Sequence, residues 1–226
     1  MTTLVVLQPG YMPWLGFFDQ MKRSDIFVYY DDVQFDKNGW RNRNRIKAPD
    51  GSAHWLTVPV RTKGLESKRI MDIPIDTRAP WAKKQIGTLK QFYAKAPHAG
   101  EYLPQLEEIL MKPWEMLIDL DIELVKQFCV WLGLKPNIKR SSELKIGGEK
   151  SGRLLALCKH FGASRYLSGD SAKDYLDMDL FKKEGVEVEW QQYKHPVYPQ
   201  LHGEFIPYLS VIDLLLNAGG RSGEMI

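Results

Sequence analysis

At 226 residues, with 44% hydrophobic and 26% charged residues, the chain is long enough to bury one good core or two small ones, and its composition does not indicate disorder. A net charge of +3 is too small to indicate, by itself, a partner such as nucleic acid or a membrane surface. The N-terminus has no basic segment before its short apolar run, and no apolar stretch approaches the length of a membrane span. We therefore expect a soluble, cytoplasmic protein.

The first fifty residues have the pattern of a strand, a loop, a helix and a second strand. Residues 4–7 are apolar and largely β-branched, which predicts a strand buried on both faces of a parallel sheet. Two prolines and a glycine in residues 8–13 end this strand, and apolar residues return at helical spacing from Trp14 to Met21, where Gly16 leaves room for a close approach to the backbone. Residues 26–30 read as the next strand.

Ligands of open α/β sheets bind beyond the carboxyl ends of the strands. This rule places residues 8–13 and the pair Asp31 and Asp32 at one rim of the predicted sheet. An aspartate pair beside a diphosphate could hold Mg²⁺, although adjacent residues of a strand point apart, so at most one of them should face a ligand.

Residues 41–47 alternate between cationic and other side chains. If they are extended, Arg41, Arg43, Arg45 and Lys47 share one side, and Asn42 lies on the other. Guanidinium groups in a row suit phosphate or carboxylate ligands. A solvated edge strand that blocks aggregation is the alternative interpretation. A turn at residues 49–52 and a strand at 54–58 follow.

The middle of the chain is predicted to be helical. After a short strand at residues 70–75, apolar periodicity and proline or glycine punctuation predict a helix that stops before Pro97, a second that ends before Pro113, and a third that ends at Gly133. We interpret residues 79–133 as a helical insertion within a single domain of residues 1–226. Cys129 and Cys158 lie in helical apolar patterns and are expected to be buried free thiols.

The α/β alternation resumes near residue 137. A strand at residues 165–168 runs into Ser168, Gly169, Asp170 and Ser171, whose backbone N–H groups and hydroxyls could hold an oxyanion, although such residues also form turns without any ligand. A strand at residues 186–190 leads to His195 at the same rim, where it is our preferred general base.

The end of the chain carries helix signals. Ser210 and Asp213 have the spacing of a capping box, and Gly219 is expected to stop the helix, with residues 220–226 fraying. Together these elements predict an α/β fold with a mainly parallel, three-layer, Rossmann-like sheet.

Several motifs resemble the WbqC-like family of bacterial proteins. They are LQPGYMPWLGFF at 7–18, DDVQF at 31–35, WRNRNRIK at 40–47, WLTVPV at 55–60, YLSG at 166–169, DYL at 174–176 and FIPYLSVIDL at 205–214. The resemblance spans nearly the whole chain. It implies an association with gene clusters for O-antigen and related surface polysaccharides, and hence work on amino sugars or their nucleotide-linked precursors. Many members have a histidine at the position of Leu7.

Our first hypothesis is a transferase, of acyl or aminoacyl type, acting on an amino sugar or a nucleotide-linked sugar. Asp32 or His195 would be the base. The residues that we expect to bind substrate are Gln8, Tyr11, Trp14, Trp40, Asn42, Arg43, Arg45, Ser168, Gly169, Asp170, Ser171 and Tyr175.

Two other functions remain open. A nucleotidyltransferase would share the strand, proline loop and helix, but Trp14 and Gly16 stand where its histidine pair is expected. A nucleic-acid-binding protein could stack bases on Trp40 and Trp55 beside the arginines, although the low net charge argues against nucleic acid as a partner. The scattered histidines and cysteines lack the spacing of a zinc site, and the sequence does not indicate which cofactor, if any, is used.

Overall fold

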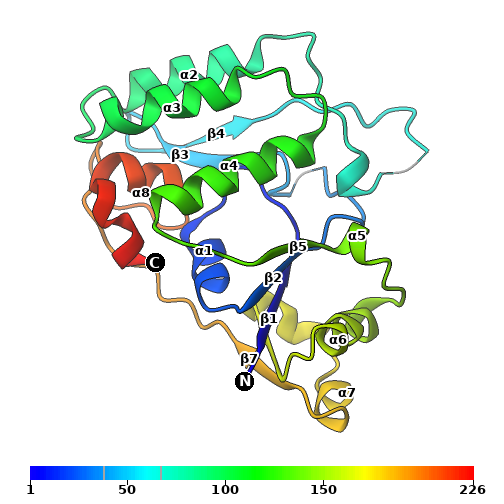
Figure 1. The fold of residues 1–226 in the computed structure, drawn as a ribbon. Helices are drawn as coiled ribbons and strands as arrows, with labels where there is room; N and C mark the ends of the chain where they lie inside the picture. Colours follow the sequence, from blue (N-terminus) through cyan, green and yellow to red (C-terminus); the bar gives the residue numbers. More distant parts are fainter. Residues whose placement is uncertain (38, 67) are drawn as a thin grey trace.

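The computed structural model describes residues 1–37, 39–66 and 68–226 (Figure 1). Its centre is a five-stranded sheet in which every neighbouring pair of strands is parallel. The strand order is β5-β2-β1-β6-β7. The bounds are Thr3–Leu7 for β1, Ile26–Tyr29 for β2, Ile138–Arg140 for β5, Arg165–Ser168 for β6 and Glu187–Trp190 for β7. The prediction of a mixed α/β protein with a mainly parallel sheet is confirmed.

Both faces of the sheet are covered, which explains why the central strands read as continuous apolar runs. Val5, Phe27 and Leu167 belong to one hydrophobic cluster, whereas their neighbours Leu4 and Val28 belong to a second. Successive side chains of a strand point to opposite faces, so each strand supplies both clusters. The first cluster also contains residues of α1 (Leu15–Lys22), and the second contains residues of α6 (Lys150–His160) and α7 (Met178–Lys183).

An antiparallel hairpin and three helices extend the first cluster. The hairpin is formed by β3 (Arg43–Lys47) and β4 (Ala53–Thr57), and the helices are α2 (Trp81–Phe92), α3 (Ala99–Leu110) and α4 (Leu117–Trp131). In Figure 1, α2 and α3 lie side by side next to the hairpin, away from α6 and α7. The amphipathic helices predicted from periodicity are therefore present, and their apolar sides are buried in this cluster.

Two local predictions are wrong. Residues 70–75 do not form a strand: Ile70–Asp72 is a 3₁₀ turn (η1), followed by isolated bridges that join Ile75 to Val60 and Pro74 to Met116. The end of the chain does not fray. After α8 (Val211–Ala218), Gly219–Met225 forms a 3₁₀ segment (η3). This segment is docked, because Lys22 Nζ donates to the carbonyl oxygen of Gly223 at 3.2 Å.

The strand order reverses direction between β1 and β6. From β1 the chain adds β2 and then β5 on one side, and it later adds β6 and β7 on the other. In an open parallel sheet the loops on either side of such a point diverge, and the crevice beyond the carboxyl ends of the two strands is where ligands bind. A ligand site is therefore expected at the loops after β1 and β6. The other short segments are α5 (Ser141–Leu144) and the 3₁₀ turn η2 (Asp170–Asp174).

Candidate functional site

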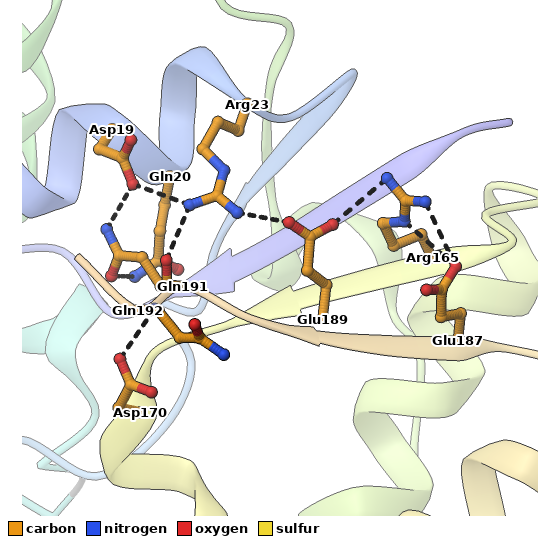
Figure 2. A network of polar contacts seen from close by, with 9 residues as sticks. All are labelled: Asp19, Gln20, Arg23, Arg165, Asp170, Glu187, Glu189, Gln191 and Gln192. Atoms are coloured by element: carbon orange, nitrogen blue, oxygen red, sulfur yellow. Dashed lines mark hydrogen bonds and ion pairs between the residues drawn. The ribbon is translucent and has the colours of Figure 1, made fainter. Parts of the chain in front are cut away.

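Gln191, directly after β7, holds α1 against the ends of β6 and β7, and its side chain is almost fully buried. Its Nε2 donates to the carbonyl oxygen of Gly16 and to Asp19, each at 2.7 Å, while its Oε1 accepts from Gln20 at 2.7 Å (Figure 2). Its backbone N–H donates to the carbonyl oxygen of Ser168. The side chain and the backbone N–H of this one residue thus fix α1 against the ends of β6 and β7, a role that sequence reasoning missed.

Charged side chains surround this amide. Arg23 donates to the carbonyl oxygen of Gln191 at 3.0 Å and pairs with both Asp19 and Glu189 (Figure 2). The start of the chain segment that leads to His195 is therefore fixed relative to α1.

The indole of Trp14 lies over the start of α1. A Cβ atom added at Gly16 would come within 2.1 Å of Trp14 Cη2, so the glycine is required by the chain's own tryptophan. The close approach predicted at Gly16 is thus made by Trp14. In a nucleotidyltransferase-like site a phosphate would lie over this turn. Here the indole covers it.

His195 lies against Trp14 through a cluster of aromatic rings. The Trp14 ring contacts Tyr193 at 5.1 Å and Tyr208 at 5.5 Å between centroids, and the His195 ring lies 5.9 Å from Tyr193 and 5.2 Å from Tyr208. We call Trp14, Tyr193, His195 and Tyr208 the aromatic cluster. Two of the predicted site residues, from opposite ends of the chain, are brought together here. Tyr193 and Tyr208 were missed, because neither lies in a regular element whose pattern could indicate it.

The protonation state of His195 is set by its surroundings. Its Nδ1 lies 2.8 Å from the carbonyl oxygen of Pro196, which fixes Nδ1 as the protonated nitrogen and leaves the lone pair on Nε2. Nε2 is buried and has no hydrogen-bond partner among the described residues. Burial lowers the pKa of His195, against the opposing effects of the Pro196 carbonyl and the charge of Asp213. A neutral imidazole with an open Nε2 is the form that a general base requires.

The segment between β7 and α8, which carries His195, contains no helix or strand, and long segments of this kind usually serve a function. Its middle is anchored by buried Asp213, which accepts from Tyr93 Oη at 2.6 Å, Tyr198 Oη at 2.8 Å and Gln200 Nε2 at 2.9 Å. Burial raises the pKa of Asp213, although these hydrogen bonds and Lys47 oppose the rise.

The predicted capping box between Ser210 and Asp213 is not formed. Ser210 Oγ does cap α8, but its backbone N–H donates to the carbonyl oxygen of Arg45, and the Asp213 carboxylate bonds to tyrosines instead. The residue that we assigned to a helix cap thus anchors the segment beside His195.

Two arginines and two tryptophans form an exposed face on the hairpin. Arg43 Cζ lies 4.3 Å from the centroid of the Trp55 ring, and Arg45 Cζ lies 5.4 Å from that of Trp40. The two indole rings are 5.2 Å apart, and both tryptophans are about 40% exposed (43% for Trp40 and 40% for Trp55). We call these four residues the Arg–Trp face. Exposed aromatic rings alternating with guanidinium groups suit a planar or cyclic anionic ligand.

The Arg–Trp face borders the aromatic cluster. Arg45 Nη2 donates to the carbonyl oxygen of Tyr208 at 3.4 Å, and the backbone of Arg45 accepts from Ser210. On its other side β3 lies along the loop after β1, because Asn44 Nδ2 donates to the carbonyl oxygens of Tyr11 and Met12. The two groups of residues therefore form one continuous surface. Gln8 is half-buried in the loop after β1.

The ends of the predicted cationic row turn inward. Arg41 is partly buried and donates to the carbonyl oxygen of Pro9, and burial lowers its pKa. Lys47 is fully buried, and its Nζ donates to the carbonyl oxygens of Gly203 and Glu204. The row expected at residues 41–47 is thus reduced to Arg43 and Arg45, because the two outer cations hold neighbouring segments of the backbone.

Two predicted substrate-binding residues lie in the interior. Tyr11 is fully buried, and its hydroxyl donates to Gln85 Oε1 at 2.6 Å. Asn42 is 5% exposed, and its Nδ2 donates to the carbonyl oxygen of Val58 at 2.8 Å. Neither side chain presents a polar group on the surface of the hairpin, so both support the loop and β3 from behind.

Asp31 and Asp32 bond to residues at the end of β5, in α5 and in α6, and not to the aromatic cluster. Ser141 Oγ donates to Oδ1 of both, at 3.1 Å and 2.6 Å, and Arg140 and Arg153 each pair with one of the two carboxylates. The expectation that the two side chains point apart is wrong, since both lie beyond the end of β2. Burial acts to raise the pKa of Asp32, but hydrogen bonds from Arg153 and Ser141 and the charge of Arg153 outweigh it and leave the pKa below its usual value.

The loop after β6 forms the turn η2. Ser168 is buried, while Asp170 and Ser171 are exposed, as is Tyr175 with 68% of its surface. The Asp170 carboxylate pairs with Lys173 at 2.6 Å and accepts from the backbone N–H of Gln192 at 3.0 Å (Figure 2). Gly169 packs beside Gln20. A carboxylate at this position opposes the binding of an oxyanion.

Two cavities lie elsewhere on the molecule. One of about 230 Å³ is lined by residues at the start of α2 and the end of α3, among them Trp81 and Trp114. The other, of about 460 Å³, lies between residues 60–63 and 76–78. Neither is lined by a predicted site residue. No group of three or more histidine, cysteine, aspartate or glutamate side chains in the described ranges is arranged to hold a metal ion.

The fold and these surfaces define an α/β protein with a parallel five-stranded sheet and a mixed aromatic and cationic surface beside its strand-order reversal. The chain belongs to the WbqC-like protein family, whose model matches residues 8–224. It is similar to the "Uncharacterized protein Rv1507c" of Mycobacterium tuberculosis, with 35% identity over 228 residues, covering 100% of this chain and 98% of that protein. No solved structure matches significantly. Among the helices of the described residues, none has the length and apolarity needed to cross a bilayer.

Proposed function

We propose that the protein is a cytoplasmic transferase of acyl or aminoacyl type that acts on an amino sugar or a nucleotide-linked sugar for surface polysaccharide such as O-antigen. The observation that carries the proposal is the continuity of the Arg–Trp face with the aromatic cluster that contains His195. A nucleotide-linked sugar offers what such a surface can hold: anionic phosphates for Arg43 and Arg45, and flat or cyclic groups for Trp40 and Trp55.

The proposed sheet is of the Rossmann-like, three-layer kind, in a single domain with residues 79–133 as a helical insertion. The strand order, with its reversal between β1 and β6, and the helices on both faces support this interpretation. The insertion would then have a structural role, because its helices share the hydrophobic cluster on which the hairpin rests.

In the proposed reaction His195 acts as the general base. Its Nε2 removes a proton from the sugar amine or hydroxyl as that group attacks the carbonyl carbon of an activated acyl donor such as a thioester. The new C–N or C–O bond forms, the C–S bond breaks, and the proton passes from the imidazolium to the departing thiolate.

Access to Nε2 requires the aromatic cluster to open. Tyr208 is the exposed ring over His195, with 48% of its surface accessible, and its backbone has φ of +60°, a conformation that costs a residue other than glycine free energy. Displacement of Tyr208 by a substrate would relieve that cost and uncover Nε2.

The proposal is tested by calorimetric titration with a nucleotide-linked amino sugar, UDP-N-acetylglucosamine. Replacement of a guanidinium that contacts phosphate costs about 1.5–3 kcal/mol, so Arg43→Ala should weaken binding by at least about tenfold while changing the melting temperature little. Arg165→Ala is the control, because Arg165 pairs with Glu187 and Glu189 at the amino end of β6. An unchanged binding curve for Arg43→Ala, with a lowered melting temperature, would assign Arg43 to the scaffold.

A second function, single-stranded nucleic-acid binding, is favoured by the alternation of indoles and guanidinium groups on the hairpin. A salt titration separates the two. Affinity for an oligonucleotide that falls steeply with salt supports nucleic-acid binding, whereas salt-tolerant binding of the nucleotide sugar with none of the oligonucleotide rejects it.

A further inference from the structure

The cavity between residues 60–63 and 76–78 is lined by cationic side chains and includes no residue of the Arg–Trp face or the aromatic cluster. Its volume is about 460 Å³. The polar residues that line it are Lys37, Arg61, Thr62, Lys63, Asp76 and Arg78. This is large enough for a phosphate or diphosphate group, and four of these side chains are cationic. Arg43, Arg45 and His195 do not line it, so it is separate from the surface assigned to the proposed function.

The backbone that carries the cavity is paired rather than loose. Val60 and Ile75 form an antiparallel bridge. On either side of it the backbone N–H of Arg61 donates to the carbonyl oxygen of Pro74 at 3.0 Å, and that of Asp76 donates to the carbonyl oxygen of Pro59 at 2.8 Å. The two walls of the cavity are therefore fixed relative to each other before any ligand binds, which lowers the entropy cost of binding.

The charges in the cavity are unbalanced. The carboxylate of Asp76 is held by Arg78, whose Nε donates to Oδ1 at 2.8 Å. Hydrogen bonds from Arg78 lower the pKa of Asp76 to about 2, so the pair is ionised and mutually neutralised at neutral pH. Among the described residues, no carboxylate forms an ion pair with Lys37, Arg61 or Lys63. The charge of Arg61 also lowers the pKa of Asp76, and with four cationic side chains to this one carboxylate the described lining carries an excess of three positive charges.

We propose that this cavity binds the phosphate or diphosphate group of a small ligand. A guanidinium supplies two parallel donors to phosphate oxygens, and the two ammonium groups supply charge. The hydroxyl of Thr62 is a further donor, and Val60 gives the cavity an apolar side. A monocarboxylate would leave most of the positive charge unmatched, whereas a diphosphate matches it. The cavity is thus a second anion site, distinct from the Arg–Trp face.

The test uses inorganic pyrophosphate as the probe, titrated calorimetrically into the full chain at low ionic strength. Arg61→Ala and Lys63→Ala should each weaken binding at least about fivefold, and the double variant at least about tenfold, because charge-assisted hydrogen bonds are lost. Lys126→Ala, on the exposed side of α4, is the matched control and should leave the affinity within about twofold.

A variant of opposite sign strengthens the test. Asp76→Asn removes the one carboxylate among the described lining residues and frees Arg78, so it should tighten pyrophosphate binding several-fold. An equal loss of affinity in Lys126→Ala and Arg61→Ala would show general electrostatic attraction and overturn the proposal, as would the absence of saturable binding in the wild type. Arg61 and Lys63 line this cavity and are not part of the Arg–Trp face, so failure of the nucleotide-sugar titration would leave this proposal standing.

Discussion

Removal of the Asp213 carboxylate should release the segment that holds His195. Asp213 is fully buried and accepts three hydrogen bonds, from Tyr93, Tyr198 and Gln200. Each hydrogen bond to a charged acceptor contributes about 1.5–3 kcal/mol, but burial of the carboxylate itself costs free energy and the three contributions are not additive. We therefore expect Asp213→Ala to lower the free energy of unfolding by about 3–5 kcal/mol.

The assay is urea denaturation, combined with limited proteolysis of the native protein. Cleavage within residues 191–210 should become faster in Asp213→Ala, since Tyr198 and Gln200 lose their anchor. Glu108→Ala, on the exposed side of α3, is the control and should change stability by less than about 0.5 kcal/mol.

If Asp213→Ala does not fold, Tyr198→Phe provides the same test with one hydrogen bond lost and an expected cost of about 1.5–3 kcal/mol. A loss below about 1 kcal/mol in Asp213→Ala, together with unchanged cleavage, would refute the reasoning, because it would mean that the segment is held by its ring contacts alone.

Three further predictions concern Gly16, Asp121 and His195. Gly16→Ala should destabilise the protein by about 1–3 kcal/mol and alter tryptophan fluorescence, because its methyl group would meet the Trp14 ring. The control is Gly87→Ala, whose added Cβ would meet no atom within 4 Å apart from its chain neighbours and the backbone of its own helix, so it should be neutral or stabilising by up to about 1 kcal/mol. Equal effects in thermal denaturation would contradict the packing argument. Burial raises the pKa of Asp121 above 3.8, so the stability that its protonation contributes is present below that pH and is lost as the pH rises through the folded pKa. The stability of the wild type relative to Asp121→Asn should therefore fall over this range. A pH-independent difference in urea denaturation would disprove the shift. Because burial lowers the pKa of His195 below 6.5, turnover should fall only at acidic pH, and His195→Gln should abolish turnover. A rate that is limited by a group titrating above pH 7 would show that His195 is not the base.

The sheet could be predicted because its signals are local. An apolar run such as residues 4–7, bounded by a proline-glycine turn, is compatible with few structures other than a doubly buried strand, and β1 is found at Thr3–Leu7. The amphipathic periodicity of α4 has the same local character. Residues 70–75 were wrongly predicted to form a strand because apolar residues alternate in this segment, whereas the chain turns at η1 and pairs only through isolated bridges.

The candidate site could be predicted only in part, because a side chain's role depends on what surrounds it. Arg41 and Arg43 have the same charge and the same alternation in sequence, but Arg41 donates to the carbonyl oxygen of Pro9, whereas Arg43 stacks on Trp55. The spacing of Ser210 and Asp213 indicated a cap, yet the carboxylate bonds to tyrosines contributed by distant segments.

The sequence by itself determined the α/β class, the strands of the parallel sheet and the family to which the chain belongs, since apolar periodicity, turn residues and ordered motifs are written along the chain. Only the tertiary structure decided which polar groups meet. It joined Trp14 to His195, turned Asp32 toward Arg153, buried Lys47, and placed Arg61 and Lys63 around one cavity. The physical reason is that the free energy of a charge or a hydrogen-bonding group depends on its partners and its exposure to water, and both are fixed only when distant segments pack together.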